Sequence, residues 1–158
     1  MRIFIMRHGQ AQPMAISDQD RELTEHGKVE VAKMAGVLLE DKLYFDAIYV
    51  SPYIRAQQTA NIIKSVLATP TSMTTLNFIT PNDTAQPLQD YIYGHYSEQD
   101  DKREQNILIV SHMPLVSYLV AEFTNGQHAP LFQTASVAEI DYNVNTLQGQ
   151  LIAHCAPY

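Results

Sequence analysis

The stretch NILIVSHMPLVSYLVAEF, residues 106–123, gives the clearest indication of the fold. Residues 107–110 (Ile-Leu-Ile-Val) are apolar and mostly β-branched, which is typical of a strand buried on both faces. The turn 111–114 (Ser-His-Met-Pro) ends this strand, and the residues 115–123 then predict a helix. A buried strand that runs through a short turn into a helix is typical of α/β proteins.

The same alternation continues on both sides of this stretch. Further strands are predicted at 2–6, 47–50, 76–79, 135–143 and 147–155. Further helices are predicted from an N-cap at Thr24 to about Asp41, over 54–68 and within 80–96. The sequence therefore predicts an α/β three-layer sandwich, with a mostly parallel central sheet, helices on both faces and an antiparallel C-terminal hairpin.

The helix that follows Thr24 is predicted to be amphipathic. Ala32, Ala35 and Leu39 lie at helical spacing, so we expect them to share one apolar face. At 158 residues the chain is long enough for one sound core, and we expect a single domain over 1–158.

Composition excludes several classes of function. A net charge of −7 argues against nucleic acid, which needs a basic face. No apolar stretch approaches a membrane span, and Ile3–Met6 is too short for a signal peptide, so we expect a cytoplasmic protein without a membrane partner. Cys155 is the only cysteine, which leaves no internal disulfide and no thiolate metal cluster.

The basic residues are few, and their placement is informative. The chain has five arginines: Arg2, Arg7, Arg21, Arg55 and Arg103. If several of them converge, an acidic protein would carry one concentrated positive pocket. Because the guanidinium fork binds phosphate through two parallel hydrogen bonds, such a pocket would suit a small phosphate-bearing ligand.

Three predicted strands end in polar side chains that could take part in binding or catalysis. The first runs into Arg7-His8-Gly9, the second into Ser51-Pro52 with Arg55 one helical turn later, and the strand at 106–110 into Ser111-His112. Each has a plain structural explanation, such as a glycine turn or a proline helix start. Ligands of open α/β sheets bind beyond the carboxyl ends of the strands, however, and the shared placement therefore favours a common site.

These motifs, together with LTEHG (23–27), SPYIRAQQTA (51–60) and VSHMPLV (110–116), resemble the histidine phosphatase superfamily in order and spacing. The resemblance is closest to the short bacterial phosphohistidine phosphatases of the SixA type. It implies that His8 is the nucleophile and that Arg7, Arg55 and a protonated His112 surround the phosphate. No metal or other cofactor is expected, because the remaining histidines lack the spacing of a zinc site.

Two further residues have a functional and a structural interpretation. Arg21 matches an arginine common before the Leu-Thr of the family, where it could line the phosphate pocket; an ion pair with Asp18 or Glu25 is the alternative. Asp83, in TPNDTA (80–85), is the nearest candidate for the proton donor that larger members of the family use. A turn or helix-cap role explains an aspartate there equally well.

Two features that the sequence lacks, a lid subdomain and a clear proton donor, limit the possible substrates. Only residues 69–105 separate the second motif helix from the last motif strand, which leaves no room for the lid subdomain of larger relatives. The absence of a clear proton donor disfavours an alkoxide leaving group, whereas imidazole leaves readily. We therefore expect a metal-independent, monomeric protein phosphohistidine phosphatase that acts on a phosphotransfer domain or carrier. The alternatives are a small-molecule phosphomonoesterase and a noncatalytic phosphohistidine-binding module.

Overall fold

A six-stranded sheet forms the centre of the protein in the computed structural model, which describes residues 1–99 and 103–158. The strands are β1 (Arg2–Arg7), β2 (Ala47–Val50), β3 (Met73–Thr75), β4 (Asn106–Ser111), β5 (Val137–Asn143) and β6 (Gln148–Cys155). Their order in the sheet is β3-β2-β4-β1-β5-β6. The first four are parallel, while β5 and β6 form an antiparallel hairpin at the β1 edge, as the sequence predicted.

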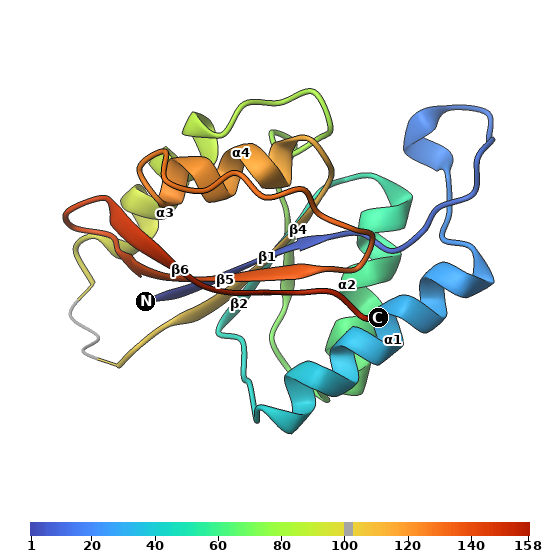
Figure 1. Ribbon diagram of the computed structural model, residues 1–158, viewed down its shortest axis with the longest axis horizontal. Coiled ribbons are helices and arrows are strands. Elements are labelled where there is room, and N and C mark those ends of the chain that lie inside the picture. Colours follow the sequence, from blue (N-terminus) through green and yellow to red (C-terminus); the bar gives the residue numbers. More distant parts are fainter. Residues whose placement is uncertain (100–102) are drawn as a thin grey trace.

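Helices cover both faces of the sheet (Figure 1). The helices are α1 (Glu25–Glu40), α2 (Ile54–Val66), α3 (Gln86–Tyr96) and α4 (Leu115–Phe123), with a 3₁₀ turn, η1, at Asp18–Asp20. Side chains alternate along β1, so Phe4 and Met6 pack with α1 and α2 while Ile3 and Ile5 pack with α3 and α4. The predicted three-layer α/β architecture is therefore confirmed.

Helix α1 begins where the sequence predicts but presents a different face. The Thr24 hydroxyl accepts a hydrogen bond from the Gly27 amide at 2.9 Å, which confirms the N-cap. Ala32 and Leu39 are exposed, so the predicted face was wrong for both. A Cβ at Gly27 would collide with the Gln10 carbonyl, so α1 packs closely through the side of the helix that carries Gly27. The buried set is Gly27, Glu30, Val31, Met34, Ala35 and Leu38.

The strand predicted at 76–79 was also wrong, because the third strand, β3, ends at Thr75. Leu76 and Ile79 are nevertheless buried in the core beside α3 and α4. The apolar residues of this segment thus reflect burial in a loop rather than extended pairing. In the part of the chain that the structure describes, no helix is both long and apolar enough to cross a membrane.

Candidate active site

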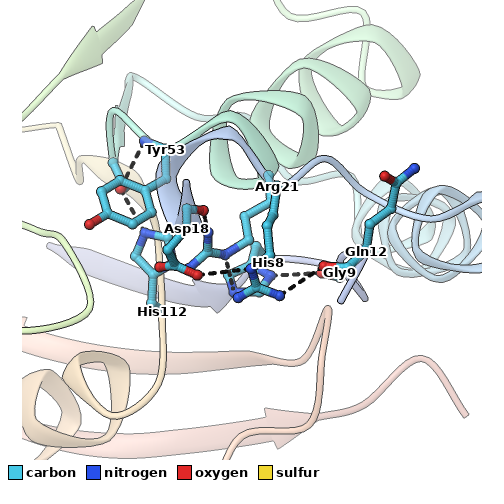
Figure 2. Close-up of polar contacts among 9 residues, drawn as sticks. His8, Gly9, Gln12, Asp18, Arg21, Tyr53 and His112 are labelled. Carbon is cyan, nitrogen blue, oxygen red and sulfur yellow. Dashed lines mark hydrogen bonds and ion pairs between the residues drawn. The ribbon is translucent and has the colours of Figure 1, made fainter. Parts of the chain in front are cut away.

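The carboxyl ends of β1, β2 and β4 meet at one edge of the sheet. β4 lies between β1 and β2, with Arg7 paired to Ser111 and Val50 paired to Val110. The residues that follow these strands therefore converge. His8 and His112 meet in this way although about 100 positions separate them in the sequence. The rings of these two histidines lie 5.1 Å apart between centroids (Figure 2).

His8 is held in one tautomer and in its neutral form. Its Nδ1 lies 2.7 Å from the Gly9 carbonyl, which can only accept, so Nδ1 carries the proton. The lone pair of Nε2 then accepts a hydrogen bond from Arg55 Nε at 3.2 Å. Burial, followed by the cationic charges of Arg55 and Arg7, lowers the pKa of His8 to about 3. Nε2 is therefore an unprotonated nitrogen that faces a guanidinium group.

The backbone around His8 is fixed on three sides. The His8 amide donates to the Ser111 carbonyl at 3.1 Å, and the Gly9 amide donates to the Thr59 hydroxyl at 3.1 Å. A Cβ at Gly9 would lie 2.7 Å from both the Gly27 carbonyl oxygen and a methyl group of Val31. Only glycine therefore fits here, and this tight packing against α1 keeps the imidazole on a rigid part of the chain.

Arg55 is buried and is oriented by Asp18, a residue the sequence did not single out for the site. Arg55 Nη1 donates to the Asp18 carbonyl at 2.7 Å, and Nη2 donates to its carboxylate at 3.1 Å. The Arg55 guanidinium also lies 4.9 Å from the centre of the Tyr53 ring. Burial alone would raise the pKa of Asp18, but hydrogen bonds from Arg21 and Arg55 outweigh it and lower that pKa. Asp18 is therefore an anion that holds Arg55 beside His8.

Arg21 reaches the site through the same aspartate. Its Nε donates to Asp18 at 2.8 Å, and its Nη1 donates to the Gln12 carbonyl at 2.9 Å. The ion pair with Asp18 that the sequence offered as an alternative is therefore present. The charge of Arg21 also contributes to lowering the pKa of His8, so this arginine acts on the site electrostatically even in its paired state.

Burial keeps His112 in its neutral form here, and a protonated His112 beside a bound phosphate stays a prediction. Burial, followed by electrostatic coupling to the His8 imidazole and by the charge of Arg55, lowers the pKa of His112 to about 2. Its Nε2 lies 2.7 Å from the Ser51 hydroxyl, which already accepts from the Tyr53 amide. We assign the hydroxyl proton to this bond, which places the imidazole proton on Nδ1.

Two buried nitrogens of the site have no hydrogen-bond partner among the described residues. They are Arg7 Nε and His112 Nδ1. Among the described residues, the Arg7 side chain is hydrogen-bonded through Nη1, which donates to the Phe132 carbonyl at 2.7 Å. Leaving a buried donor unpaired costs about 1–3 kcal/mol, so both groups favour a ligand with several acceptor oxygens. A phosphoryl group has that chemistry.

Asp83 lies in a turn before α3. Its carboxylate accepts from the amide and the hydroxyl of Thr80, at 2.7 and 2.6 Å. Within the described residues it makes no hydrogen bond or ion pair with His8, Arg7, Arg55 or His112. The turn role is thus present, and a proton-donor role stays a prediction. Across residues 1–99 and 103–158, no group of three or more His, Cys, Asp or Glu side chains is arranged to hold a metal ion.

Known phosphatases resemble this chain, which agrees with the geometry of the site. A model of the histidine phosphatase superfamily (branch 1) matches residues 3–76. The phosphohistidine phosphatase SixA of Escherichia coli (strain K12) is 36% identical over 140 residues, covering 89% of this chain and 84% of SixA. A SixA homolog of Haemophilus influenzae is 34% identical over 164 residues, covering 99% of this chain and 96% of the homolog.

A solved structure extends this similarity to the whole fold. The protein histidine phosphatase SixA complexed with tungstate superimposes with a TM-score of 0.92 at 34% identity, covering 99% of this chain and 97% of that one. Sequence similarity over nearly the full chain and the same fold lead to one conclusion. This chain belongs to the histidine phosphatase superfamily, and within it to the SixA type.

Proposed function

We propose that the protein is a protein phosphohistidine phosphatase, which transfers the phosphoryl group of a phosphorylated histidine first to His8 and then to water. The observation that carries the proposal is the neutral, buried His8, whose Nε2 faces Arg55. The SixA relatives, which are named as phosphohistidine phosphatases, support the same substrate class.

In the first step the site holds the phosphoryl oxygens and His8 attacks. Arg7 Nε, His112 Nδ1 and the Arg55 guanidinium supply donors to the three oxygens. As the phosphate enters, Arg55 Nε transfers its hydrogen bond from His8 Nε2 to an oxygen, which frees the lone pair. A bond forms between Nε2 and phosphorus while the substrate P–N bond breaks, and its electron pair leaves with the imidazole. Catalysis here is chiefly positioning and neutralisation of charge.

The leaving group explains why a strong proton donor is dispensable. The conjugate acid of imidazole has a pKa of about 6.5, so the departing ring needs far less help than an alkoxide. Asp83, the nearest candidate acid, is engaged with Thr80. In the second step, water attacks the phosphorus on His8 and the N–P bond breaks, so that the lone pair returns to Nε2. The phosphate leaves as dihydrogen phosphate, which carries both protons of the water.

A protein substrate is supported by an apolar rim, which we define as Met14, Ile16 and Leu131. These side chains are 82%, 102% and 82% exposed. The loop with Met14 and Ile16 leads into Asp18, which binds Arg55, and Leu131 precedes Phe132, whose carbonyl binds Arg7. Exposed apolar side chains on segments that lead into a polar site favour contact with another protein surface. We further propose a monomeric, cytoplasmic enzyme that is metal-independent and consists of one domain over 1–158.

The test compares two ³²P-labelled substrates: a phosphohistidine carrier protein and a phosphomonoester. We expect release of phosphate from the carrier by the wild-type protein and none by His8→Asn. Faster turnover of the monoester would replace the proposal by the small-molecule alternative. Tight binding of the carrier without release would favour a noncatalytic module.

The rim adds a second comparison on the same assay. The triple variant Met14→Ser, Ile16→Ser, Leu131→Ser should lower kcat/KM for the carrier about tenfold and leave turnover of phosphoimidazole, which cannot reach the rim, within about twofold. Leu39→Ser is the control, because it removes an exposed apolar side chain from α1, outside the rim. Equal loss on both substrates would show that the rim does not contact the carrier.

A further inference from the structure

The segment 132–136 contacts Arg7 and His8 of the first motif. The Phe132 carbonyl accepts from Arg7 Nη1 at 2.7 Å, and the Ser136 carbonyl accepts from the Arg7 amide at 3.1 Å. The Ala135 amide donates to the His8 carbonyl at 3.0 Å. This segment, which comes from the connection between α4 and β5, therefore sets the position of the Arg7 guanidinium and of the backbone that carries His8.

The conformation of this segment needs support from outside. Ala135 has a φ of +60°, a backbone conformation that residues with a β carbon rarely adopt. Within the segment, the Ser136 hydroxyl donates to the Gln133 carbonyl at 2.7 Å, and the Ser136 amide donates to the same carbonyl at 3.2 Å. These contacts close a tight turn, but they do not attach that turn to the rest of the protein.

Glu30 attaches this turn to α1. It is 3% exposed, and its Oε2 accepts from the Thr134 hydroxyl at 2.5 Å, while its Oε1 lies 3.0 Å from His26 Nε2. Burying a carboxylate is costly unless its oxygens are bonded. Burial also lowers the pKa of Arg7, and the Glu30 charge opposes that shift, so the carboxylate lies within electrostatic range of the guanidinium.

We propose that Glu30 and Thr134 are positioning residues: their hydrogen bond fastens the segment 132–136 to α1 and thereby holds Arg7 in the orientation that binds a phosphoryl oxygen. Neither residue touches the phosphate, and both act through the Phe132 carbonyl and Arg7. The inference rests on the proposed phosphate site, and it is tested by anion binding, which does not depend on the identity of the substrate.

The first measurement is the Kd for tungstate by calorimetry, with the melting temperature measured in parallel. Thr134→Val removes the hydroxyl at nearly constant volume and should weaken tungstate binding about tenfold. Thr134→Ser keeps the hydroxyl and should restore the wild-type Kd to within about twofold. Thr124→Val is the matched control, because Thr124 is a buried threonine whose hydroxyl bonds the Val120 carbonyl in the same connection but outside the segment.

A double-mutant cycle separates positioning from a general loss of stability. If Thr134 acts through Arg7, adding Thr134→Val to Arg7→Ala should leave the tungstate Kd of Arg7→Ala unchanged. An undiminished tenfold loss in that background would overturn the proposal. So would a lower melting temperature of Thr134→Val with an unchanged Kd, since a purely structural bond would behave in that way.

The proposal stays testable if Thr134→Val does not fold. Thr134→Ala removes the hydroxyl without adding a methyl group against Glu30 and carries the same expectation for tungstate. Failure of both variants to fold would contradict the proposal, because a structural role alone would then account for the bond. If the wild-type protein binds tungstate but does not release phosphate from a phosphohistidine carrier, the proposed function fails while this inference is still decided by the Kd values.

Discussion

Replacing His8 should remove a large part of the dependence of stability on pH. In the folded protein the pKa of His8 is lowered to about 3, whereas in the unfolded chain it is about 6.5. Between these values the unfolded chain binds a proton that the folded protein does not. The free energy of unfolding therefore falls as the pH falls through this window. Above the pKa of His8 in the unfolded chain, His8 is neutral in both states and this loss of stability is absent.

The size of the effect follows from the two pKa values. On going from about pH 6 to about pH 4.5, proton binding by the unfolded chain at His8 costs the folded protein about 2 kcal/mol. His8→Asn removes this titration, and its side-chain amide can still donate to the Gly9 carbonyl in place of Nδ1. Wild type should therefore lose about 2 kcal/mol more than the variant over this interval.

The assay is equilibrium unfolding in urea at both pH values, in buffers free of phosphate. The buried His112 and carboxylates such as Asp18 also change protonation between the two states, but they are common to both proteins and cancel in the difference. His128→Asn, which removes an exposed histidine, separates the effect of the buried imidazole from that of losing any histidine. Equal losses in wild type and His8→Asn would show that folded His8 titrates as it does in the unfolded chain, and the neutral nucleophile would be refuted.

Three further substitutions test other parts of the site. Ser51→Ala removes the partner of His112 Nε2 and should lower kcat and tungstate affinity about tenfold, measured by steady-state kinetics and calorimetry; unchanged values would contradict the assigned tautomer. Arg55→Lys should lower kcat at least about 100-fold in the same kinetics, because an ammonium group cannot bond His8 and Asp18 together as the fork does. Gly9→Ala should destabilise the protein by roughly 2 kcal/mol or more in urea unfolding, since its Cβ would meet Gly27 and Val31 at 2.7 Å.

The strand ends could be predicted from the sequence because two local rules agree there. A buried apolar run identifies each strand, and parallel strands bring their carboxyl ends to one edge of the sheet. These rules place Arg7, His8 and His112 together, and Arg55 follows one helical turn after β2. The same reasoning fails for β3, since Leu76 and Ile79 are apolar for reasons of burial and not of strand pairing.

The residues that orient the motif could not be found in this way. Asp18 holds Arg55 partly through a backbone carbonyl, and Phe132 holds Arg7 entirely through one. The types of the side chains do not reveal such backbone contacts. Glu30 and Thr134 are 104 positions apart and meet only because α1 packs beside the start of β5. The neutral form of His112 likewise depends on burial, which is known only once the three strand ends are assembled.

The most direct test of the account is to trap the phosphoryl group on the enzyme. Wild-type protein is mixed with a ³²P-phosphohistidine carrier, quenched in alkali within milliseconds, and digested for mass spectrometry. We predict an alkali-stable phosphoryl group on His8 that forms before free phosphate and disappears as phosphate is released. Release of phosphate with no label on His8, or release that persists in His8→Asn, would contradict the assignment of His8 as the nucleophile.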